Sequence, residues 1–149
     1  MDVRTSTQRR WLRSHISSLL TTMTGEPVPT DADGDYPVRG TTSQAWVRLS
    51  TGEPCGVHVF AYAARDVPAR AAVLRELNQH NLGHLGTRVA WADGGLVLVD
   101  CFVFADAITE ETLTAVVGRV LHLADQLGPV LTAMHGGTTY HSASSASAA

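Results

Sequence analysis

An amphipathic helix is the first element that the hydrophobic pattern predicts, over residues 6–23. Thr5 and Gln8 have the spacing of a capping box at its start, and Gly25 and Pro27 stand just beyond its end. We therefore interpret the polar residues 24–34 as a loop. The apolar positions recur every three or four residues, as on one face of a helix, and they are Leu12, Ile16, Leu19, Leu20 and Met23.

Alternating apolar and polar positions predict three strands next, near residues 35–39, 43–50 and 55–64. A period of two residues places alternate side chains on opposite faces of a strand. One predicted face carries small aliphatic side chains, which are Ala45, Val47, Leu49, Val57, Val59, Ala61 and Ala63. The other face carries larger and more polar side chains, which are Trp46, Arg48, Ser50, His58, Phe60, Tyr62 and Ala64.

A second helix and a hairpin follow. The helix opens at Asp66-Val67-Pro68, where a proline in the first turn is tolerated, and it extends to about Asn81. Strands at 87–92 and 95–106 flank Asp93-Gly94, a strong hairpin signal between apolar runs. The second of these strands is apolar on both faces, apart from Asp100, which indicates that both of its faces are covered. We expect a partner subunit or a peptide to supply part of that cover.

The last predicted helix starts near Thr109 and carries a long apolar stripe. Gly128-Pro129 should kink or stop this helix. Residues 137–149 are rich in Ser and Ala and lack side chains to bury, so we expect a disordered tail after a single domain at 1–136. The order of elements is helix, three strands, helix, two strands, helix, which is typical of an α+β fold rather than an alternating βαβ fold.

Composition narrows the classes of protein that fit. The chain has 149 residues, of which 44% are hydrophobic, and two cysteines, which predicts one globular domain without a disulfide scaffold. Its net charge of −3 is unlike that of a general nucleic-acid binder. The chain contains no run of about 18 apolar residues, so the sequence does not predict a membrane-spanning helix. Gln8-Arg9-Arg10 is followed by polar residues rather than by the apolar stretch of an export signal, so we expect a cytoplasmic protein.

The second half of the chain carries a recurring family pattern. The pattern consists of Leu77-Asn78-Gln79-His80-Asn81, then Gly86 to Gly94 ending in Asp93-Gly94, then the apolar strand that ends at Val99-Asp100. In this pattern, and in the order of its elements over about residues 6–135, the chain resembles the YbjN-like and type III secretion chaperone-like (TY-Chap) proteins common in actinobacteria. The resemblance implies an antiparallel five-stranded sheet with three helices. It also implies a non-enzymatic domain that binds a peptide or protein client, often as a homodimer.

No residue pattern in the chain predicts catalysis, a metal site or a cofactor. Cys55 and His58 stand three apart, which on a strand places them on opposite faces and separates a thiol from its base. Cys101 stands among valines and is interpreted as a small core residue. His80 and His84 have a zinc-ligand spacing, but Gly83 interrupts the helix and no third ligand is obvious. We therefore expect a protein that is not an enzyme.

Five residues on the predicted aromatic face are the candidate binding residues. Aromatic rings with polar tips are common at protein interfaces, and these residues are Trp46, Arg48, His58, Phe60 and Tyr62. The alternative is an ordinary sheet face covered by the protein's own helices. Whether the two strands place these side chains together depends on a pairing register that the sequence does not reveal.

Two further polar features admit more than one interpretation. Asn78 and Asn81 either close the second helix and fix the loop that follows, or read a client's backbone. The N-terminal arginines either form a solvated helix face or dock on an acidic surface, and they are Arg4, Arg9, Arg10 and Arg13. The leading hypothesis is a chaperone-like module that binds a peptide or protein client. Docking through the arginines and a small enzyme are the alternatives.

Overall fold

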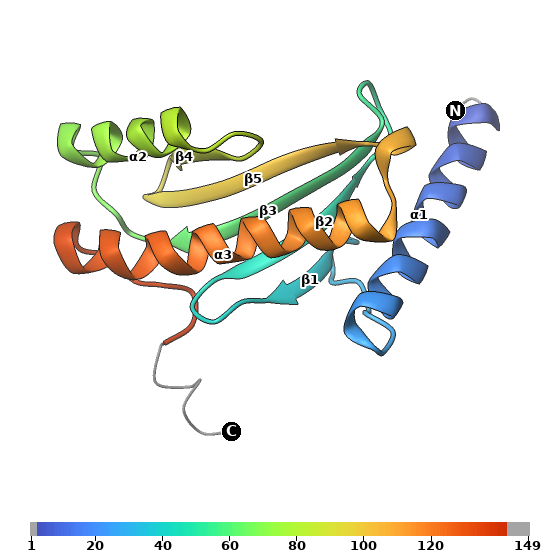
Figure 1. Cartoon of the computed structure of the whole chain (residues 1–149), viewed down its shortest axis with the longest axis horizontal. Coiled ribbons are helices and arrows are strands. Elements are labelled where there is room, and N and C mark those ends of the chain that lie inside the picture. The colour runs from blue at the N-terminus through green and yellow to red at the C-terminus, as the bar shows by residue number, and fades with distance from the viewer. Residues whose placement is uncertain (1–2, 143–149) are drawn as a thin grey trace.

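The structure, a computed structural model, describes residues 3–142 and has the predicted α+β order (Figure 1). Three long helices and a five-stranded antiparallel sheet make up this order. The helices and strands are α1 (Val3–Thr24), β1 (Tyr36–Arg39), β2 (Gln44–Ser50), β3 (Gly56–Ala64), α2 (Ala71–Gly83), β4 (Arg88–Ala92), β5 (Leu96–Phe104), the short 3-10 helix η1 (Ala105–Ala107) and α3 (Glu110–His135).

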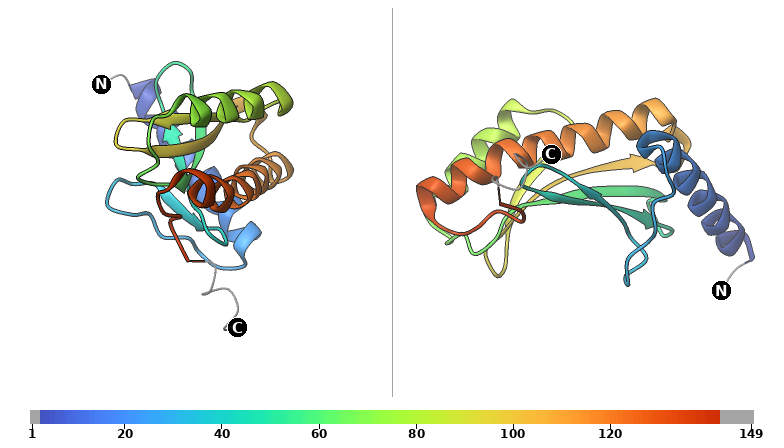
Figure 2. Two further views of the ribbon diagram at one scale, coloured as in Figure 1. Left: turned by 90° about the vertical axis from the view of Figure 1, so that its left-hand side faces the viewer. Right: turned by 90° about the horizontal axis from the view of Figure 1, so that it is seen from below.

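The sheet has the spatial order β1-β2-β3-β5-β4, and every neighbouring pair is antiparallel. α3 runs along one face of the sheet, with α2 beside it and α1 at one end (Figures 1 and 2). The small aliphatic side chains of β2 and β3 point to this helix-covered face, as the two-residue period predicts, and all of them are buried except Leu49, which is partly buried against the core. They form the core together with Leu12, Ile16 and Leu20 of α1, Val73 and Leu77 of α2, and Leu113, Val117, Val120, Leu127 and Leu131 of α3.

The final helix passes through Gly128-Pro129 without stopping and ends at His135, so of the two predicted outcomes, a kink or a stop, the stop is wrong. Proline lacks an N–H, so it removes only one bond from the helical ladder. Leu127 and Leu131, on either side of it, are fully buried against the sheet. The hydroxyl of Thr132 also donates to the carbonyl of Gly128 at 3.0 Å. Burial of the apolar stripe on both sides of Pro129 keeps the helix continuous.

α3 is also tied to the turn between β1 and β2. The Asp125 carboxylate accepts hydrogen bonds from the backbone N–H groups of Thr41, Thr42 and Ser43, at 2.9–3.0 Å, and from the Ser43 hydroxyl at 2.8 Å. Burial alone would raise the pKa of Asp125, but these bonds outweigh it and lower the pKa below its usual value. A Cβ on Gly40 would lie 2.6 Å from the Ser43 Oγ, so the turn requires glycine there.

The chain after α3 returns to the sheet, which corrects the predicted boundary of the tail at residue 137. Thr138 and Arg65 exchange two backbone hydrogen bonds of 2.8 and 2.9 Å, and the His141 N–H donates to the Thr42 carbonyl at 2.8 Å. Backbone pairing therefore seats residues 138–141, although their composition predicts no packing. The remainder of the predicted tail, residues 143–149, lies outside the described residues.

Candidate functional site

The face of the sheet opposite α3, which we call the open face, carries all five candidate binding residues. Register decides this, because Trp46 pairs with Phe60, Arg48 pairs with His58, and Tyr62 lies on the same face two residues beyond Phe60. No helix of the described residues packs over this face, which appears as the lower side of the arched sheet in the right-hand view of Figure 2. The register thus places the five side chains on one face, a question that the sequence alone left open.

Trp46, Phe60 and Tyr62 form a group of contacting rings on the open face, which we call the aromatic cluster. The Trp46 ring stacks on Phe60 with a centroid separation of 5.6 Å and meets Tyr62 at 5.0 Å. The Arg48 guanidinium carbon lies 4.9 Å from the Phe60 ring centroid, within cation–π range. The His58 ring centroid lies 5.1 Å from that of Phe60. These neighbours leave Phe60 only 7% exposed, so it supports Trp46 and Tyr62, which are half-buried at the surface.

Two buried carboxylates hold the cations of the open face in place. Asp35 accepts hydrogen bonds from the Arg48 Nη2 at 2.6 Å and from the Arg48 Nε at 3.0 Å. Asp100 of β5 accepts from the Arg88 Nε at 3.0 Å and lies 2.8 Å from the His58 Nε2. Burial alone would raise the pKa of Asp100, but the bonds from His58 and Arg88 outweigh it and lower the pKa. Asp100 thus joins β3, β5 and β4 on this face.

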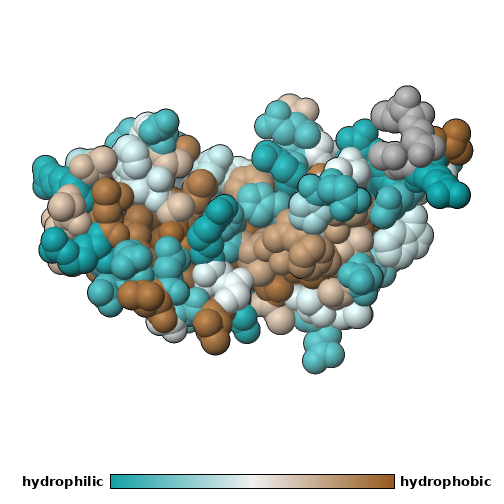
Figure 3. Space-filling model, turned by 90° about the horizontal axis from the view of Figure 1, so that it is seen from above, coloured by the Kyte–Doolittle hydropathy of each residue, from teal (hydrophilic) through white to brown (hydrophobic). Residues whose placement is uncertain are grey.

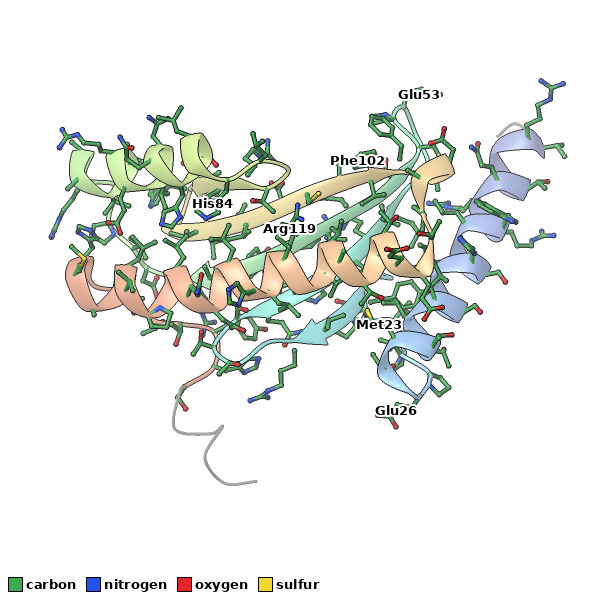
Figure 4. The ribbon with its side chains drawn as sticks, viewed as in Figure 1. Met23, Glu26, Glu53, His84, Phe102 and Arg119 are labelled. Atoms are coloured by element: carbon green, nitrogen blue, oxygen red, sulfur yellow. The ribbon has the colours of Figure 1, made fainter. Side chains whose placement is uncertain are left out.

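A shallow hollow of about 720 Å³ lies beside the aromatic cluster. Its lining includes Arg48, His58, Arg88 and Phe102. Phe102 lies on β5, toward the end of the sheet where the β2–β3 turn carries Glu53 (Figure 4). An open hollow that holds one phenylalanine ring and two paired arginines suits the side chains of an extended polypeptide better than a small molecule, which proteins usually enclose.

The comparison with protein families decides the class of this chain. Residues 10–143 match the family described as T3SS (YopN, CesT) and YbjN peptide-binding chaperone 1. The chain belongs to this family. It is therefore a chaperone-like module that binds a peptide or protein, and the resemblance inferred from residues 77–100 is confirmed. A search of curated protein sequences finds no significant match.

Solved structures support the fold of this chaperone-like module. A chain of the ExsC–ExsE complex matches with a TM-score of 0.63 at 19% identity, covering 88% of this chain and 97% of that one. A chain of the HopA1–SchA chaperone–effector complex matches with a TM-score of 0.64 at 11% identity, covering 87% and 98%. The structure of the Yersinia pestis type III secretion chaperone SycH with a fragment of YscM2 gives 0.58 at 20% identity, covering 74% and 98%.

The cysteines and histidines of the chaperone lie in no catalytic arrangement among the described residues. Cys55 precedes β3 and packs against the core, whereas His58 is engaged with Asp100 on the open face. Burial raises the pKa of the Cys101 thiol, which is the opposite of what a nucleophilic thiol needs. The His80 and His84 rings stack at 5.4 Å. Within residues 3–142, no three His, Cys, Asp or Glu side chains are placed to hold a metal ion.

Other polar candidates of the chaperone have structural partners or lie elsewhere. Asn81 donates to the Val89 carbonyl at 2.9 Å and accepts from the Val89 N–H at 2.7 Å, so it fixes the loop after α2, as one of its two interpretations predicts. The N-terminal arginines Arg4, Arg9, Arg10 and Arg13 are exposed on α1, outside the aromatic cluster. No helix among residues 3–142 has the length and apolar character needed to cross a membrane.

Sequence reasoning missed three residues of the open face. Asp100 and Arg88 complete its charge network, and Tyr140 packs edge-on against Trp46 with a centroid separation of 5.8 Å. Asp100 carried a usable signal, because a carboxylate inside an otherwise apolar strand needs a cationic partner. Tyr140 carried none, since it stands alone in a segment of Gly, Thr, Ser and Ala.

Proposed function

We propose that the chaperone holds an extended segment of its client on the open face, with the aromatic cluster as the main anchor point. The observation that carries this proposal is the register that pairs Trp46 with Phe60 and Arg48 with His58 on a face without a helix. Apolar client side chains would pack on Trp46 and Tyr62. Arg48, whose side chain is 51% exposed despite its bonds to Asp35, would pair with a client carboxylate or carbonyl.

The test starts from a peptide selected for binding. Random 12-residue peptides displayed on phage are selected on the immobilised native chain, and the best one is synthesised and titrated by calorimetry. Trp46→Ala should weaken its binding by about 2 kcal/mol, the loss typical of an interface tryptophan. The free energy of unfolding should fall by clearly less than the roughly 3–5 kcal/mol of a core aromatic.

Trp11→Ala is the matched control for this measurement. Trp11 is 53% exposed on α1, away from the open face, so its removal should leave the affinity for the peptide unchanged. Equal losses of affinity in the two variants would exclude the open face as the specific site. A Trp46→Ala chain that binds normally would do the same.

We also propose that two copies pair through α2. Apolar side chains lie exposed at the end of the molecule that carries α2 (Figure 3). They are Leu74, Leu82 and Leu85 in and just after α2, and Val130 and Met134 in the last turns of α3. Leu74 and Leu82 lie eight residues apart on one side of α2, with Asn78 between them. A two-fold axis through Asn78 would place the leucines of one copy against those of the other, which is the self-complementarity that a dimer requires.

The dimer is tested by light scattering at tens of micromolar. The native chain should give twice the mass of one chain, and Leu82→Glu should give a monomer with unchanged circular dichroism. A monomeric native chain at that concentration would refute the pairing.

The module is further proposed to act without catalysis and in the cytoplasm, which is supported by its family and by the pairing of His58 with Asp100 rather than with a nucleophile.

A further inference from the structure

The segment that follows α3 reaches the open face and forms hydrogen bonds at its edge. We call residues 136–142 the strap. The Thr138 pairing with Arg65 seats the strap just beyond the end of β3, and the His141 N–H bond to Thr42 seats it just before the start of β2. The His141 Nε2 also lies 3.1 Å from the side-chain oxygen of Gln44. Four hydrogen bonds therefore fix the strap at the ends of the two strands that carry the aromatic cluster.

Glycines allow the strap to turn back onto the sheet. Gly136 and Gly137 both have positive φ, at 93° and 97°, a conformation that other residues rarely adopt. A Cβ on Gly137 would lie only 2.4 Å from the carbonyl oxygen of Arg65. Any larger residue at position 137 would push the strap away from Arg65 while leaving the aromatic cluster itself unchanged.

Tyr140 brings the strap into the aromatic cluster. Its ring lies edge-on to Trp46, and the Arg65 guanidinium carbon lies 5.0 Å from its centroid. Trp46 thus has Phe60 and Tyr62 of the sheet beside it and Tyr140 of the strap as a third aromatic neighbour. Backbone pairing at the edge of the cluster and a ring on Trp46 are the two contacts that an extended client segment would make there.

We propose that the strap is a built-in competitor of the client, and that the client segment carries an aromatic side chain which replaces Tyr140 on Trp46. This inference rests on the proposed function of the open face. A tethered competitor acts at a high effective concentration. If about ten molecules hold the strap seated for each one in which it is released, the apparent Kd of the client rises by about tenfold. The strap would thus keep the aromatic cluster covered against weak, non-specific ligands.

The experiment compares the native chain with four single-residue variants, and the phage-selected 12-residue peptide is the probe. Tyr140→Ala removes the competing ring, and Gly137→Ala unseats the strap without altering any ring of the cluster. Both variants should bind the peptide a few-fold to about tenfold more tightly than the native chain, the range expected for one aromatic pair. Tyr140→Phe keeps the ring and should bind as the native chain does. Replacing the peptide's aromatic residue by Ala should abolish the gain.

Gly118→Ala is the control for a glycine substitution, since its Cβ would meet no atom within 4 Å. It should leave the affinity unchanged. If Tyr140→Ala or Gly137→Ala binds the peptide as tightly as the native chain does, or more weakly, the strap is not a competitor and the inference is overturned. Weaker binding to Tyr140→Ala alone would instead make Tyr140 a part of the binding surface.

A spectroscopic readout separates this inference from the proposed function. The indole N–H signal of Trp46, assigned by its absence in Trp46→Phe, should shift between the native chain and Tyr140→Ala without any peptide. An unchanged signal would show that the strap does not cover Trp46, and would overturn the inference while leaving the open face as a client site. A selected peptide that binds equally to the native chain and Trp46→Ala would remove the proposed function instead.

Discussion

Replacing Asp125 by Asn should destabilise the chaperone, although the two side chains have the same size. The carboxylate accepts five hydrogen bonds from the β1–β2 turn, three of them from the backbone N–H groups of Thr41, Thr42 and Ser43. Four of these bonds converge on Oδ1 and the Thr41 N–H donates to Oδ2, so an amide NH2 group in the Oδ2 position would face the Thr41 donor, and the other four bonds would no longer be charge-assisted. One unsatisfied N–H group costs about 1–3 kcal/mol and neutral bonds are weaker than charged ones, so the free energy of unfolding should fall by about 2–3 kcal/mol.

The effect should depend on pH in a defined direction. Because the folded-state pKa of Asp125 is lowered, its contribution to stability is complete above the unfolded pKa of about 3.9 and is lost as the pH falls through the folded pKa. The difference between the native chain and Asp125→Asn should therefore be constant near neutral pH and shrink below about pH 4.

Urea titrations of both chains between pH 7 and pH 3 measure this difference. Glu111→Gln is the matched control, because it removes one carboxylate from the exposed first turn of the same helix. It should change the free energy of unfolding by less than about 1 kcal/mol. An Asp125→Asn chain within 1 kcal/mol of the native chain at pH 7 would refute the reasoning, as would a difference that persists unchanged at pH 3.

Two glycines of α3 should respond to alanine in opposite directions in urea titrations. Gly118→Ala should raise the free energy of unfolding by about 0.5–1 kcal/mol, since its Cβ meets open space. Gly128→Ala should lower it by about 2 kcal/mol or more, because its Cβ would lie 2.2 Å from the Ala63 carbonyl oxygen. A change of the same sign in both variants would contradict this packing. Asp100→Asn should cost about 2–3 kcal/mol at pH 7 by weakening the pairs with His58 and Arg88. Because the Asp100 pKa is lowered, that loss should begin to shrink below about pH 4 and disappear only as the pH falls through the folded-state pKa, and a loss independent of pH would point to packing instead.

The period-two pattern of β2 and β3 was enough to predict which side chains share a face within each strand. It placed Val47 and Val59 in the core and Trp46 and Phe60 away from it, as the structure has them. Pairing between strands depends on the turn that joins them and on contacts far apart in the chain, so the meeting of Trp46 with Phe60 was not readable from either strand alone.

Long-range contacts explain where the sequence prediction failed. Pro129 is a helix breaker by local preference, but burial of the neighbouring leucines against the sheet outweighs that preference. The strap has the composition of a flexible tail, yet Thr138 pairs with the backbone of Arg65. No pattern in the residues around Thr138 predicts this pairing. Composition measures how much a segment can bury, and it does not reveal the unpaired backbone groups that another segment offers.

The position of Asp100 also bears on the entropy of client binding. Its bonds to His58 and Arg88, with those of Asp35 to Arg48, restrain three side chains before any client arrives. A surface that had to order these side chains on contact would lose about 0.5–1.5 kcal/mol for each one. In this chaperone the three side chains lose that conformational entropy when the chain folds. The entropy change on client binding therefore comes chiefly from the ordering of the client and the release of the strap. Calorimetry with peptides of increasing rigidity should accordingly show affinity rising with the stiffness of the peptide.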